Sequence, residues 1–128
     1  MPHLVLTGGV DLAAISLEPA VHRWGRAVMK TEGSWRRVGG DALLVEGVVV
    51  EFSRPLHPVA LLAPHDGGTI VRLWPIVAVE RTHPVQRWLC LLSVELQRAG
   101  AGPVRVTNIP PELWRDLDLA VVPELAET

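Results

Sequence analysis

The sequence predicts an α+β fold in which two strand–helix–strand (βαβ) units form a four-stranded mixed sheet with two helices on one face. Two observations lead to this fold class. Apolar patterns follow the order strand, helix, strand, irregular insert, strand, helix, strand. The expected strands are continuous apolar runs, which are typical of strands buried on both faces. We expect a single domain over residues 1–128, with a loose tail at residues 119–128.

The first unit opens with a short strand and a helix. Residues 4–6 form the strand, and two glycines end it. Pro19 fits the first turn of a helix, so a helix start near Ser16 is favoured over a start near Asp11. The apolar residues that recur at helical spacing are Leu17, Ala20, Val21, Trp24 and Val28.

A long strand closes the first unit, and an irregular insert follows it. Residues 42–52 are rich in β-branched side chains, and Gly47 is a candidate position for a bulge. The insert, residues 54–68, contains three prolines. We expect residues 59–63 to pair with residues 69–73 as a hairpin across a glycine-containing turn.

The second unit contains the most regular pattern in the chain. A strand at residues 76–79 precedes a helix that either Thr82 or His83 caps. The apolar stripe of this helix is Val85, Trp88, Leu89, Leu92, Leu96 and Ala99. A strand at residues 103–107 completes the unit, and a short helix at residues 110–114 follows.

Composition excludes several classes of function. The net charge is −2 and no basic run exists, so we expect no nucleic-acid partner. No apolar run reaches the length of a membrane span, and the N-terminus lacks the basic region of a signal peptide. Cys90 is the only cysteine, which excludes an internal disulfide and fits a reducing compartment. We therefore expect a cytoplasmic protein without a membrane partner.

The predicted sheet leaves one face without helices. Because the strands read as apolar on both sides, that face would expose a large apolar surface, which soluble monomers avoid. Self-association is the simplest way to cover it.

The N-terminal residues carry the candidate chemistry. An initiator methionine is usually removed before a small second residue, which here would free the secondary amine of Pro2. An α-amino group titrates at about 8, and a nearby cation or apolar wall lowers that pKa further. Such an amine can act as a general base at neutral pH. Proline is also a common second residue without any such role, so both interpretations stay open.

These features together resemble the tautomerase superfamily. The resemblance lies in the opening residues 1–4, in the order of the two βαβ units, in the uncovered sheet face and in residues 74–81, where a proline-led strand ends in Glu80 and Arg81. The resemblance implies a homotrimer that needs no cofactor. Its implied activity is that of a tautomerase or isomerase, moving a proton next to the carbonyl of a small 2-oxo or unsaturated carboxylic acid.

The resemblance also implies roles for single residues. Pro2 would be the catalytic base. Arg81 would bind the substrate carboxylate, together with Arg105 and with Arg37, for which Arg36 is the alternative. The chain departs from the family pattern because it contains no tyrosine, which several relatives use as an acid or an orienting group.

We expect no metal site, because the histidines and Cys90 do not show the spacing of metal ligands. Two other interpretations of the chain remain open. The first is a non-catalytic homotrimeric scaffold or binding module with the same fold, in which Pro2 is blocked or buried. The second is an unrelated ferredoxin-like domain that is monomeric in solution.

Overall fold

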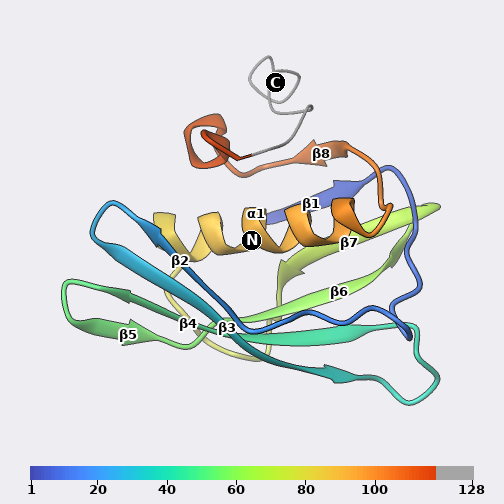
Figure 1. Cartoon of the computed structure of the whole chain (residues 1–128), viewed down its shortest axis with the longest axis horizontal. Coiled ribbons are helices and arrows are strands. Elements are labelled where there is room, and N and C mark those ends of the chain that lie inside the picture. The colour runs from blue at the N-terminus through green and yellow to red at the C-terminus, as the bar shows by residue number, and fades with distance from the viewer. Residues whose placement is uncertain (118–128) are drawn as a thin grey trace.

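The computed structural model describes residues 1–117, which form one curled sheet around one long helix (Figure 1). The strands are β1 (His3–Leu6), β2 (Ala20–Trp24), β3 (Ala27–Arg36), β4 (Leu43–Glu51), β5 (Arg54–Leu56), β6 (Val59–His65), β7 (Gly68–Leu73) and β8 (Val104–Thr107). The α-helix, α1, spans His83–Arg98, and a short 3-10 helix, η1, spans Pro111–Trp114. The predicted loose tail at residues 119–128 lies outside the described residues.

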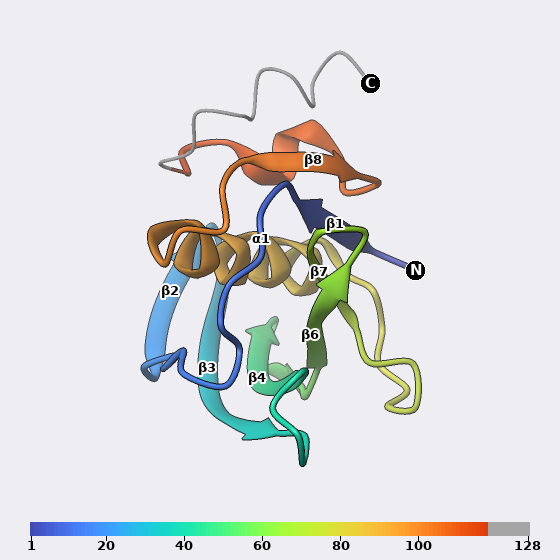
Figure 2. The ribbon, with the colours of Figure 1, turned by 90° about the vertical axis from the view of Figure 1, so that its right-hand side faces the viewer.

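All strand pairs of the sheet are antiparallel. The strand order is β2-β3-β4-β6-β7-β1-β8, and β5 pairs with the last residues of β4. The sheet curls into a half-barrel whose concave side holds α1 (Figure 2). The predicted mixed sheet of two βαβ units with two helices is therefore wrong. The resemblance to the tautomerase superfamily is wrong with it, because that fold is built from those units.

The segment predicted as the first helix forms a hairpin instead. Trp24 pairs with Ala27, so only Gly25 and Arg26 form the turn between β2 and β3. Gly25 has a φ of +58°, and two-residue turns with glycine in this position are typical of hairpins. Burial alternates along β3, where Ala27 and Met29 face the core. The period-two pattern therefore prevails over the helical spacing of the apolar residues.

The middle of the chain forms the strands predicted there and additional strand residues in the predicted insert. The strand predicted at residues 42–52 is β4, and β6 pairs with β7 as the expected hairpin. The insert at residues 54–68 is not irregular, since it supplies β5 and β6 to the sheet. The bulge lies in β3, between Thr31 and Gly33, and not at Gly47.

The helix α1 is confirmed close to its predicted bounds. Thr82 is its N-cap, and the Thr82 hydroxyl accepts a hydrogen bond of 3.3 Å from the Val85 N–H. Gly100 follows the helix with a φ of +102°. The strand predicted at residues 76–79 does not form, because these residues belong to the connection between β7 and α1. Within residues 1–117, no helix has both the length and the apolar composition that crossing a membrane requires.

The two ends of the described chain meet in the sheet. β1 lies between β7 and β8, and both its pairings are antiparallel. The structure confirms two predicted strands, at residues 4–6 and 103–107. It also confirms the short helix predicted at residues 110–114. The three apolar residues of β1 are buried.

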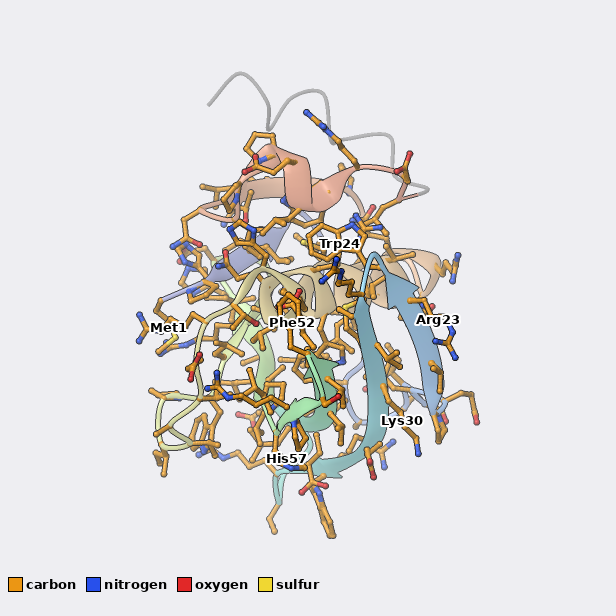
Figure 3. The ribbon with its side chains drawn as sticks, turned by 90° about the vertical axis from the view of Figure 1, so that its left-hand side faces the viewer. Met1, Arg23, Trp24, Lys30, Phe52 and His57 are labelled. Carbon is orange, nitrogen blue, oxygen red and sulfur yellow. The ribbon has the colours of Figure 1, made fainter. Side chains whose placement is uncertain are left out.

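The core fills the space between α1 and the concave face of the sheet. Trp88 is fully buried there, and its Nε1 donates a hydrogen bond of 3.1 Å to the Thr31 hydroxyl on β3. Arg87 holds η1 against α1, because its Nη1 donates to the carbonyl oxygens of Leu113, at 3.0 Å, and Arg115. The Arg87 guanidinium also lies 5.5 Å from the ring centre of Trp24, which points from β2 toward α1 (Figure 3).

Candidate functional site

The candidate site lies on the convex face of the sheet, opposite α1. Leu43 and Val45 are buried against the core, so strand alternation turns Leu44 to the convex face. Strand pairing sets one residue from each of five neighbouring strands in a row across this face: Trp35, Leu44, Leu61, Arg72 and His3. We call this set the outer row.

The Trp35 end of the outer row forms an open groove of about 390 Å³, which we call the aromatic groove. Its apolar lining residues are Trp35, Ala42, Leu44, Leu61, Ala63 and Trp74. Trp35 is 64% exposed, although its indole is a large apolar group. Tryptophan beside aliphatic side chains is the composition that protein interfaces favour.

Two arginines line the edge of the aromatic groove. Arg36 is engaged within the chain, because its Nε and Nη2 donate to the carbonyl oxygens of Leu12 and Ile15 at 3.3 and 3.0 Å. Arg37, which the family resemblance nominated, instead forms an ion pair of 3.7 Å with Asp41. Both side chains of this pair are well exposed, so the pair contributes little to stability and stays accessible to charges on a partner.

Pro2, the predicted base, is buried, and its ring nitrogen is bonded to the carbonyl carbon of Met1. An amide nitrogen is not basic, so Pro2 can act as a base only after Met1 is removed. Met1 and Arg81 line the same hollow of about 300 Å³, which brings Arg81 near the N-terminus. The role of Pro2 as a base stays a prediction.

The three predicted carboxylate-binding arginines do not meet in one site. Arg37 lines the aromatic groove, whereas Arg81 lines the hollow beside Met1. Arg105 is exposed on the edge strand β8, where its Nη1 donates to the backbone carbonyl oxygen of Asp66 at 3.4 Å. Within one copy of the chain, these three side chains therefore do not surround a single substrate carboxylate.

Cys90 lies on α1 and is fully buried. Burial raises the pKa of its thiol, an effect that the Arg87 guanidinium one turn earlier opposes only in part, so the thiol is protonated at neutral pH. A buried, protonated thiol is a poor nucleophile. Within residues 1–117, no group of three or more His, Cys, Asp or Glu side chains is placed to hold a metal ion.

Sequence reasoning missed the apolar residues of the aromatic groove. The expectation of an apolar sheet face opposite the helices pointed to a surface of this kind, but it named no residue on it. The signal was available in β4 and β6, where apolar residues occupy both alternating positions and not only the core-facing ones. Trp35 and Trp74 carried no local signal, because Trp35 reaches this face through the pairing of β3 with β4 and Trp74 lies just after the end of β7.

No protein-family model, curated protein or solved structure matches the chain. The function is therefore argued from the convex face of the sheet itself.

Proposed function

We propose that this protein is a binding module that self-associates through its aromatic groove. The observation that supports this function is the run of Trp35, Leu44 and Leu61 on three neighbouring strands, with no charged residue between them. The hydrophobic effect favours a partner that covers an apolar surface of this kind. Its burial stabilises an association by about 25 cal/mol for each Å² of apolar area removed from water.

A second copy of the chain is the partner that the groove edge fits. Arg37 and Asp41 carry opposite charges 3.7 Å apart, and both are exposed. A two-fold axis near this pair sets Arg37 of each copy against Asp41 of the other, so the edge is complementary to itself. Two-fold contacts require this kind of self-complementary surface, and we therefore propose a homodimer.

The proposal differs in stoichiometry from the trimer that the sequence led us to expect. That number came with the family resemblance, whereas the self-complementary edge favours a pair of copies. A cytoplasmic location belongs to the same proposal, because the buried, unpaired thiol of Cys90 suits a reducing compartment.

The test is the molar mass in solution, measured by sedimentation equilibrium over a wide range of concentrations. The wild type is expected to approach twice the 14.0 kDa of one chain. Leu61→Glu puts a carboxylate into the aromatic groove and is expected to give monomers. Val21→Glu makes the same change at an exposed position on the edge strand β2, outside the groove, and should remain dimeric.

Circular dichroism and thermal melting establish that both variants are folded. The self-association proposal fails if the wild type is monomeric at every concentration, or if folded Leu61→Glu is still dimeric.

The two-fold arrangement has its own test. Arg37→Glu alone should weaken the dimer, and Arg37→Glu combined with Asp41→Arg should restore it, because the two changes together exchange the charges of the edge.

A second candidate function is the proton transfer predicted from the sequence, with Pro2 as base and Arg81 binding the carboxylate of a small 2-oxo acid. The observation in its favour is the hollow that Met1 and Arg81 share. Intact mass shows whether Met1 is removed, and a screen of 2-oxo acids follows, with Arg81→Met as the variant expected to lose activity. Retention of Met1 would exclude this function, because the Pro2 nitrogen then remains an amide.

A further inference from the structure

The His3 end of the outer row forms another hollow on the convex face, which we call the histidine hollow. It has a volume of about 340 Å³ and is lined by residues of β1, β7 and β8, of the β6–β7 hairpin and by Met1. Three basic side chains line it: His3, His65 and Arg72. Its chemistry differs from that of the aromatic groove, because it combines cationic and apolar groups.

Arg72 lies at the centre of this chemistry. Strand pairing sets it between His3 on β1 and Leu61 on β6. Within residues 1–117 the Arg72 guanidinium forms no ion pair, and its Nε is buried without a hydrogen-bond partner. A guanidinium binds a carboxylate through two parallel N–H donors. The described residues therefore present a cation to the hollow without supplying an anion that would neutralise it.

The neighbouring charged groups leave Arg72 unneutralised. The Nδ1 of His3 lies 3.1 Å from the carbonyl oxygen of Met1 and donates to it, which leaves the Nε2 of His3 open. The carboxylate of Asp66 lies 3.4 Å from the Nε2 of His65 and forms no ion pair with Arg72. The backbone carbonyl of Asp66 accepts the hydrogen bond from Arg105, a further cation beside the hollow.

The remaining lining of the hollow is apolar. Val5 and Ile70 lie opposite each other on β1 and β7, and Val106 lies opposite Val5 on β8. Val106 is 48% exposed and Ile70 is partly exposed, so these two side chains are open to a ligand, whereas Val5 is buried. We propose that the histidine hollow binds a monocarboxylate with a short hydrocarbon chain. Arg72 holds the carboxylate through its guanidinium N–H donors, and the hydrocarbon lies on Ile70 and Val106. This binding goes beyond self-association and does not depend on it.

The experiment is a calorimetric titration of the full-length protein with hexanoate and with hexanamide. The two compounds share a hydrocarbon chain, and only hexanoate carries a charge. The wild type is expected to bind hexanoate at least about tenfold more tightly than hexanamide, and Arg72→Met should lower the hexanoate affinity by a similar factor. Arg98→Met removes an exposed arginine of α1 whose partner is Glu95, and it should leave the affinity unchanged.

Val106→Glu is the second variant, because its exposed position tolerates a polar side chain and the new carboxylate repels hexanoate. It is expected to abolish hexanoate binding even if Arg72→Met does not fold. The proposal is overturned if the wild type does not bind hexanoate, if hexanamide binds equally well, or if folded Val106→Glu keeps the wild-type affinity. The molar mass of the same samples reports self-association separately, so the loss of one property is not mistaken for the loss of the other.

Discussion

Gly47 and Trp88 are in direct contact, because a Cβ placed on Gly47 would lie 2.6 Å from two atoms of the Trp88 indole. The indole occupies this place only because residue 47 has no side chain. Gly47→Ala is therefore expected to lower the free energy of unfolding by about 1–3 kcal/mol, the usual effect of overpacking a core. Urea unfolding followed by circular dichroism measures it.

The matched control for this substitution is Gly33→Ala on β3. A Cβ on Gly33 meets no atom within 4 Å, and the φ of Gly33 is not in the left-handed region. We expect the free energy of unfolding of this variant to stay within about 0.5 kcal/mol of the wild type. Equal unfolding midpoints for the two variants would mean that the contact between Gly47 and Trp88 does not limit the size of the side chain at position 47.

The hydrogen bond between Trp88 and Thr31 gives a second prediction. Thr31→Val keeps the shape of the side chain but leaves the Trp88 Nε1 as a buried donor without an acceptor. The expected loss in the free energy of unfolding is about 1–3 kcal/mol. Thr31→Ser keeps the hydroxyl, so its loss should be smaller. If serine destabilises as much as valine, the methyl group of Thr31 matters more than its hydrogen bond.

The contacts of Arg87 predict a local effect at η1. Arg87→Met keeps much of the apolar stem but removes the donors to the carbonyl oxygens of Leu113 and Arg115. The cost of leaving such groups unsatisfied is about 1–3 kcal/mol. Hydrogen–deuterium exchange should accelerate at residues 111–114. Arg98→Met removes an exposed ion pair with Glu95 and should leave that exchange unchanged, so acceleration in both variants would contradict the assignment.

Burial of Cys90 predicts a loss of stability in alkali. Burial raises the pKa of the thiol in the folded protein above its ordinary value of 9.0, so the folded state holds this proton more tightly than the unfolded chain does. The contribution is fully present below pH 9 and is lost as the pH rises above it. Each further pH unit should remove about 1.4 kcal/mol from the free energy of unfolding.

Cys90→Ala provides the comparison for this pH dependence. The variant is expected to be less stable at pH 7 because it loses a buried group, but it lacks the titrating thiol. The difference in the free energy of unfolding between wild type and variant should therefore shrink between pH 9 and pH 11, in urea titrations under reducing conditions. A difference that is constant over this range would show that the thiol does not titrate differently on unfolding.

The elements that could be predicted are those whose signals lie close together in the sequence. The helix α1 could be predicted because its signals are local: the Thr82 cap, the apolar stripe and Gly100. Residues 20–36 could not, because Val21, Trp24 and Val28 fit a helical period as well as a strand. The pairing of β3 with β4 decides between the two, and it is not visible in a local window.

The candidate sites depend even more on pairing. Leu44 and Leu61 are ordinary strand residues until β4 and β6 align them beside Trp35. Arg72 lies in a hairpin strand that was predicted correctly, yet its proximity to His3 follows only from the placement of β1 beside β7. The family resemblance directed attention to Pro2, Arg81, Arg105 and Arg37, and the structure brings only Arg81 near the N-terminus.

The position of β1 between β7 and β8 has a consequence for biosynthesis. β1 is made before both of its partners, and neither partner exists until residues 68–73 have been made. At about 5–20 residues per second, residues 4–6 wait for roughly 3–15 s before they can enter the sheet. These residues are almost completely enclosed in the finished protein, with exposures of 0%, 3% and 0%. During translation they are an unpaired apolar segment, open to capture by chaperones and to misassembly with other nascent chains.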